Sequence, residues 1–147
     1  MKRHPALAHL SRDHHGALLL ARLLQKDAPA YTGMPTDIAG KAAYALKFYN
    51  DELIKHFASE EAALKIVTGI NATLDGLIAT IFREHQDLHV SFQSIGDHPY
   101  LQTHLDELGK ALENHVRKEE RELFPLIETV SNDKLLETIN QLLSPHL

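Results

Sequence analysis

The sequence contains no cysteine and no tryptophan. The absence of cysteine excludes disulfides, thiolate zinc sites, iron–sulfur clusters and cysteine nucleophiles. Long apolar runs are also missing, since the longest near the N-terminus covers residues 17–21. A membrane-spanning helix needs about 20 apolar residues, and a secretory signal needs an apolar segment after its basic start. We therefore expect a soluble cytoplasmic protein with no membrane partner.

Charge of one sign is not concentrated in the chain. The net charge is −5, and the 15 lysines and arginines are scattered among 20 acidic residues. Nucleic-acid binding needs a basic stripe, so no nucleic-acid partner is expected. The 147 residues have the length of one ordinary domain. No linker or low-complexity segment divides them, so residues 1–147 are predicted to form a single domain, as a monomer or a homodimer.

Helical periodicity dominates the sequence, and strand-like alternation is almost absent. The apolar pattern predicts long helices over residues 6–27, 36–67, 73–95 and 100–124, separated by segments rich in proline, glycine and asparagine. Pro125 is expected to kink or end the fourth helix near Phe124. A short tail helix over 134–143 is compatible with the pattern. The predicted fold is all-α, an up-and-down antiparallel four-helix bundle with this tail as an optional fifth helix.

What the chain does contain is histidine, 11 residues in all. Each of the four apolar stripes carries one histidine where an apolar residue is expected: His14, His56, His85 and His115. Two of them have a glutamate four residues later, Glu60 and Glu119, and His85 is followed at the same spacing by His89. Residues four apart lie on one face of a helix, about 6 Å apart along its axis. One helix can therefore direct two such side chains into the same cavity.

The same pattern occurs twice along the chain. Arg12-Asp13-His14 matches Arg83-Glu84-His85, and the segment from His56 to Glu61 matches the segment from His115 to Glu120. The first two helices therefore resemble the last two. The approximate two-fold symmetry suits a site that holds two metal ions.

Imidazole and carboxylate donors together suit iron, manganese or zinc, whereas calcium and magnesium prefer all-oxygen ligands. The sequence offers seven candidate ligands: His14, His56, Glu60, His85, His89, His115 and Glu119. Carboxylates that bridge two six-coordinate ions would leave an open position, where oxygen, peroxide or nitric oxide would bind. Metal charge would also offset the cost of burying two glutamates.

Two assignments stay open at this point. His14 and His15 compete for one role, and the apolar stripe of the first helix favours His14. Glu61 and Glu120 are expected at the surface, or as partners of imidazole N–H groups.

The residues quoted above resemble the hemerythrin-like, histidine-histidine-glutamate cation-binding domain, over about residues 9–128. The resemblance implies an up-down four-helix bundle with an oxo- or hydroxo-bridged, non-haem di-iron centre. It implies that His14, His56, His85, His89 and His115 are terminal ligands, and that Glu60 and Glu119 bridge. In the oxygen-carrying hemerythrins the last acid is an aspartate five residues after the histidine. Here Glu120 occupies that place and Glu119 the one before, so the resemblance leaves the choice of bridge open.

Three functions are compatible with the sequence. The first is a metal-binding protein whose di-iron centre takes up oxygen, nitric oxide or iron for sensing, storage or stress protection. The second is an oxidoreductase that acts on nitric oxide or peroxide, or supplies iron for cluster repair. The third is a structural bundle whose histidines are incidental. The sequence does not decide whether the protein is an enzyme.

Overall fold

The computed structural model describes residues 2–144 of the chain. Within that range the chain is helical, with no strand, so the all-α prediction is confirmed. Its helices and helical turns are α1 (Pro5–Leu24), α2 (Ile38–Phe48), η1 (Tyr49–Leu53), α3 (Ile54–Ile66), α4 (Ala72–Gln93), η2 (Ile95–Asp97), α5 (Leu101–Lys118), η3 (Glu119–Leu123), α6 (Phe124–Val130) and α7 (Asp133–Leu143).

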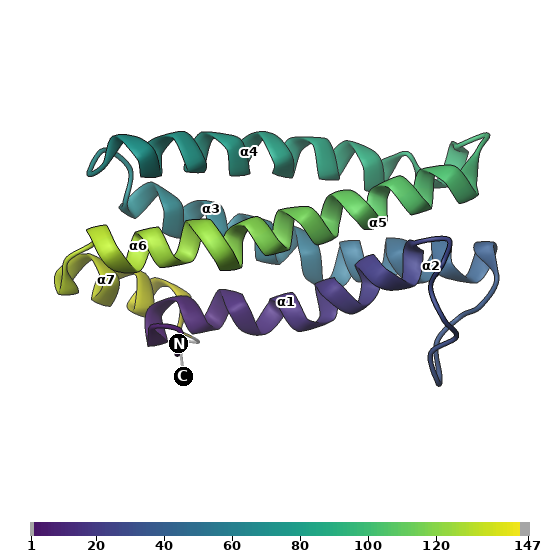
Figure 1. The fold of residues 1–147 in the computed structure, drawn as a ribbon, viewed down its shortest axis with the longest axis horizontal. Helices are drawn as coiled ribbons and strands as arrows, with labels where there is room; N and C mark the ends of the chain where they lie inside the picture. Colours follow the sequence, from purple (N-terminus) through teal and green to yellow (C-terminus); the bar gives the residue numbers. More distant parts are fainter. Residues whose placement is uncertain (1, 145–147) are drawn as a thin grey trace.

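Several of these elements join into long rods (Figure 1). The segments α2, η1 and α3 follow one another without a break, as do α5, η3 and α6. Helix α1 packs along α5, and α4 packs against α5 from another side. The short α7 packs against α1 and α3, close to the N-terminus. The tail helix expected over 134–143 is therefore present as α7.

The sequence predicts a kink or an end near Phe124, but the helix that begins with α5 does not end there and continues through Pro125 to Val130. The reason is the π-helical turn η3, in which the backbone N–H of Phe124 donates to the carbonyl of Glu119, five residues earlier. A proline in a regular helix clashes with the carbonyl four residues before it. The wider turn directly before Pro125 relieves that clash.

The apolar core is divided into two clusters. One cluster includes Ala17, Phe57 and Leu88, and the other includes Leu10, Ala63 and Ile81. Each of the long helices passes from one cluster to the other, and the residues between them on the buried face are the predicted histidines and glutamates other than His89. The fold therefore places a polar layer between two apolar ones.

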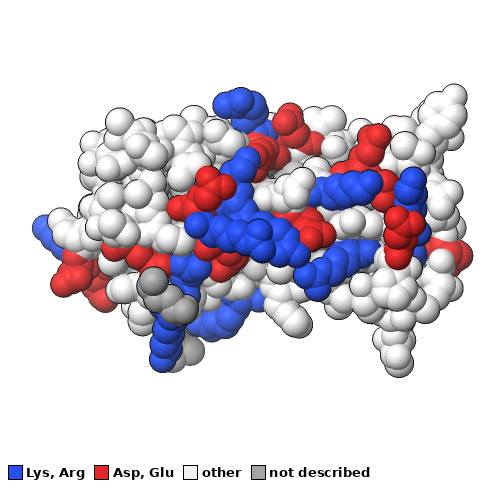
Figure 2. Space-filling model, viewed as in Figure 1, with Lys and Arg blue, Asp and Glu red and all other residues white. Residues whose placement is uncertain are grey.

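The surface carries both signs of charge. On the face shown in Figure 2, lysine and arginine side chains are interspersed with aspartate and glutamate. Among the described residues, none of the helices has both the length and the apolar character to span a membrane.

Candidate metal centre

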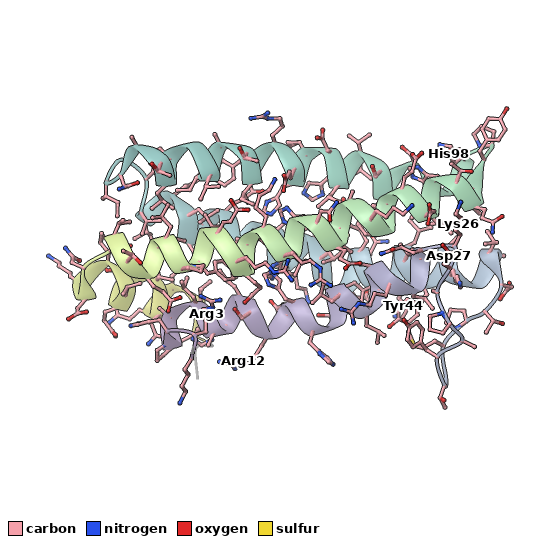
Figure 3. All side chains as sticks on the ribbon, viewed as in Figure 1. Arg3, Arg12, Lys26, Asp27, Tyr44 and His98 are labelled. Carbon is pink, nitrogen blue, oxygen red and sulfur yellow. The ribbon has the colours of Figure 1, made fainter. Side chains whose placement is uncertain are left out.

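The polar layer is formed by six buried side chains from different parts of the sequence. They are His14 on α1, His56 and Glu60 on α3, His85 on α4, His115 on α5 and Glu119 at the start of η3. None of the six is more than 5% exposed, and both glutamates are fully buried. Figure 3 shows nitrogen-bearing side chains gathered between the helices near the middle of the molecule. The fold thus brings together six of the seven ligands predicted from the sequence.

These six residues form two overlapping groups that could each hold a metal ion. One group is His14, His56, Glu60 and Glu119, and the other is Glu60, His85, His115 and Glu119. Within each group, one potential ligand atom from every residue lies within 4.8 Å of the others. Glu60 and Glu119 belong to both groups, so two carboxylates are shared between two pairs of histidines.

The potential metal-ligating atoms that face this layer have no hydrogen-bond partner among the described residues. The unpartnered atoms are Nε2 of the four histidines and both carboxylate oxygens of Glu60 and Glu119. Their nearest polar neighbours are other members of the same layer: Nε2 of His85, for example, lies 2.9 Å from Oε1 of Glu60. Buried polar atoms in native proteins are normally hydrogen-bonded. A cluster of unpartnered nitrogen and oxygen donors is the arrangement that a transition-metal ion satisfies.

The two buried carboxylates influence one another strongly. Burial favours the neutral form of both groups, and the charge of Glu60 adds to burial in raising the pKa of Glu119 well above its usual value. For Glu60, contacts with Glu119, His56 and His85 outweigh burial and hold the pKa well below its usual value. Without metal, Glu60 is therefore the carboxylate that favours the ionised form, and Glu119 is the one that favours the neutral form. Positive metal charge would allow both to ionise.

Each histidine is also held from outside the layer by an acidic side chain. Nδ1 of His14 lies 2.6 Å from Glu120, and Nδ1 of His56 lies 2.9 Å from Asp13. Nδ1 of His85 lies 2.7 Å from Glu61, and Nδ1 of His115 lies 2.8 Å from Glu84. A carboxylate on Nδ1 accepts its proton and leaves the lone pair of Nε2 free to bind metal. All four imidazoles therefore present their metal-binding nitrogen to the buried layer.

The outer contacts form a closed ring around the bundle. Asp13 of α1 contacts the histidine of α3, Glu61 of α3 contacts that of α4, and Glu84 of α4 contacts that of α5. Glu120 of η3 closes the ring on His14 of α1. Each helix thus orients a histidine of the next one, and we call these four acids the outer carboxylate ring.

The structure places the residues that competed for one role in the sequence, where the apolar stripe favours His14 over His15 and the choice between Glu119 and Glu120 is open. His14 is buried and reaches the layer, whereas His15 is exposed. Glu119 lies inside the layer, and Glu120 lies outside it against His14 and Ser11. Glu61, like Glu120, is the partner of an imidazole.

His89 is the predicted ligand that lies outside both groups. Its Nδ1 is 2.6 Å from the hydroxyl of Tyr49, and its ring is half-buried. Phe57 lies between it and the layer, with ring centroids 4.3 Å from His85 and 5.3 Å from His89.

Sequence reasoning did not assign a role to Asp13 or Glu84. A signal was present, because each of these acids directly precedes a histidine in the repeated pair Asp13-His14 and Glu84-His85. Adjacent residues point in different directions from a helix, so neither acid can serve its own neighbour. Each serves a histidine on the following helix instead.

Buried histidines and glutamates between apolar layers, on helices alone, define a helical protein whose interior could hold metal ions. The model of the hemerythrin HHE cation-binding domain matches residues 5–127. The chain belongs to this family. Neither a curated protein nor a solved structure matches it.

Proposed function

We propose that this chain is a single hemerythrin-like domain, an up-and-down four-helix bundle that binds two iron ions in its interior. His14 and His56 would hold one ion and His85 and His115 the other, with Glu60 and Glu119 shared between them. Manganese and zinc are the alternative metals, since they accept the same donors. Iron would supply the capacity to bind oxygen or nitric oxide.

The observation that carries this proposal is the set of unpartnered donor atoms in the layer. Four imidazole nitrogens and two carboxylates are buried without hydrogen-bond partners among the described residues, which is costly unless a cation binds them. The outer carboxylate ring adds to it, because every one of the four histidines is oriented by an acid on Nδ1. Incidental core histidines have no need of such paired support.

The role that suits this centre is reversible binding of a small ligand or storage of iron, for sensing or protection against stress. The two apolar clusters on either side of the layer keep bulk water from the donors. A dry, preformed site favours a small uncharged ligand such as oxygen or nitric oxide over a large substrate.

The proposal is tested by purifying the protein in air, counting its metals by mass spectrometry and recording its visible spectrum. Two irons per chain with an oxo-bridge charge-transfer band are expected. A folded, colourless protein without metal would contradict the proposal. Addition of oxygen, nitric oxide or peroxide to the reduced protein then separates binding from turnover. Repeated consumption of nitric oxide or peroxide would identify an oxidoreductase in place of a binding protein.

A further inference from the structure

Tyr49 and His89 form a pair beside the candidate centre that the binding of metal does not explain. The chain has four tyrosines, and Tyr49 is the one that is buried, with 3% of its surface exposed. Its hydroxyl lies 2.6 Å from Nδ1 of His89 and 3.4 Å from Nε2 of Gln93. The amide donates to the phenol oxygen, which leaves the phenol O–H free to donate to the imidazole nitrogen in the tautomer whose proton is on Nε2.

A row of aromatic rings connects this pair to the metal-binding layer. The ring of Phe57 stacks on His85 with a centroid distance of 4.3 Å and meets His89 edge-on at 5.3 Å. The rings of His89 and Tyr49 are 5.7 Å apart, and Tyr49 stacks on Phe92 at 4.8 Å. From His85 through Phe57 and His89 to Tyr49, successive ring centroids are 4.3, 5.3 and 5.7 Å apart, so an electron has a short path between Tyr49 and His85.

We propose that Tyr49 and His89 are a redox-active pair, in which Tyr49 gives up one electron while its phenol proton passes to Nδ1 of His89. The O–H bond of the phenol breaks and an N–H bond forms on the imidazole. The products are a neutral phenoxyl radical and an imidazolium. The one-electron oxidant is an oxidised transition-metal ion at the adjacent centre, which is reduced by one electron. Only this choice of oxidant rests on the proposed function.

The surroundings of the pair suit this chemistry. Burial raises the pKa of Tyr49, so the phenol keeps its proton near neutral pH. Burial and the neighbouring His85 lower the pKa of His89, so the imidazole is neutral and free to accept one. The ring of His89 is half-buried, which gives the proton a route back to water. The chain has no cysteine or tryptophan to compete as an electron donor.

The test uses the full chain with its other tyrosines removed, as Y31F/Y44F/Y100F, so that any tyrosyl radical belongs to Tyr49. The protein is loaded with Zn²⁺, which is redox-inert, or stripped of metal. It is oxidised by flash-generated tris(bipyridine)ruthenium(III) and followed by electron paramagnetic resonance and transient absorption. We expect a tyrosyl radical at neutral pH that forms more slowly in D₂O than in H₂O. Adding Tyr49→Phe should abolish it.

The discriminating variant is His89→Gln in the same background. Glutamine can still accept a hydrogen bond from the phenol, but it cannot take the proton. We expect radical formation to slow by about 100-fold, the size of effect that a positioned proton acceptor supplies. Circular dichroism should show an unchanged fold. If His89→Gln forms the radical as fast as its parent, with no isotope effect in either, His89 only satisfies the buried hydroxyl and the proposal is overturned.

The two proposals fail separately. A chain that binds no transition metal but forms the radical through His89 contradicts the proposed function and leaves the redox pair standing. A chain that binds two irons but shows no effect of His89→Gln contradicts the redox pair alone. With iron bound, addition of peroxide should produce the same radical signal in the protein that retains Tyr49. Absence of that signal, with photo-oxidation intact, would remove the metal centre as the oxidant.

Discussion

Asp13 on α1 lies 2.9 Å from Nδ1 of His56 on α3, across the interface between two helices. The aspartate side chain is about half exposed, while the histidine that it contacts is buried. The contact therefore joins the surface of the bundle to its interior. The same relationship recurs around the molecule in the outer carboxylate ring. The ring explains why the sequence places an acid directly beside His14, His85, Glu60 and Glu119.

Removing one member of the ring should weaken metal binding without destroying the fold. For Asp13→Asn we expect a loss of about 10- to 100-fold in metal affinity, because the amide orients and polarises the imidazole less well than the carboxylate. Competition with a chelator measures the affinity. Asp51→Asn is the matched control, since Asp51 is a similarly exposed aspartate that pairs with Lys47 on the surface. Equal affinities in the two variants would show that the contact between Asp13 and His56 has no role in metal binding.

Metal stoichiometry should reveal which residues the two ions share. Glu60 lies in both candidate groups and His14 in only one. Glu60→Ala should therefore lose both ions, and His14→Ala should retain about one per chain. Mass spectrometry of the native protein reports the count. Retention of two ions in Glu60→Ala would contradict the shared position of this carboxylate.

Loss of metal should also lower thermal stability. Binding to the folded state alone stabilises a protein, and the ligands here come from helices far apart in sequence. For His56→Ala and Glu60→Ala we expect a lower unfolding temperature than for the parent in the presence of iron, by calorimetry. After chelation the difference should shrink, because the parent then also lacks metal. A difference of the same size with and without iron would mean that these side chains stabilise the fold by packing alone.

The stability of the metal-free protein and its affinity for metal should depend on pH in opposite ways. Burial opposes protonation of His56, but Asp13 and Glu60 outweigh it and raise the pKa to about 9 in the metal-free protein. A raised pKa in the folded state stabilises the protein below the usual histidine pKa of about 6.5. That contribution is lost as the pH rises through about 9. Denaturant unfolding of the chelated protein should therefore show stability falling across this interval, less steeply in Asp13→Asn.

Metal binding requires neutral imidazole, so metal affinity should instead increase with pH over the same interval. A chelator titration at several pH values measures this trend. Metal affinity that decreases from pH 6.5 to 9 would rule out the imidazole of His56 as a ligand.

His89 was expected as a ligand on the basis of its spacing from His85, and the metal count of His89→Gln tests that prediction. Two ions per chain in the variant would show that His89 is not required. A count of one ion, or none, would restore His89 as a ligand. The spacing of four residues brings both histidines to one face of α4, but it does not fix how deep each one lies.

Much of the fold followed from the sequence because helices are local structures. The period of the apolar residues gave the helical class, and the proline- and glycine-rich segments gave the breaks. The two exceptions have different causes, one a contact between distant residues and the other a local turn. Helix α1 ends at Leu24, short of the expected Asp27, where the backbone N–H of Lys26 donates to Asp106 from α5. The helix passes Pro125 because a π-helical turn precedes it.

By itself the sequence determined the kinds of donor, their spacing along each helix and their two-fold repetition, since these depend on residue identity and helical period alone. Only the tertiary structure decided that Glu119 faces the layer while Glu120 faces His14, and that Asp13 supports His56. Adjacent residues differ by about 100° around a helix, so one faces the core and the other an edge. Which helix lies across that edge is set by the packing of the whole bundle, and no local pattern records it.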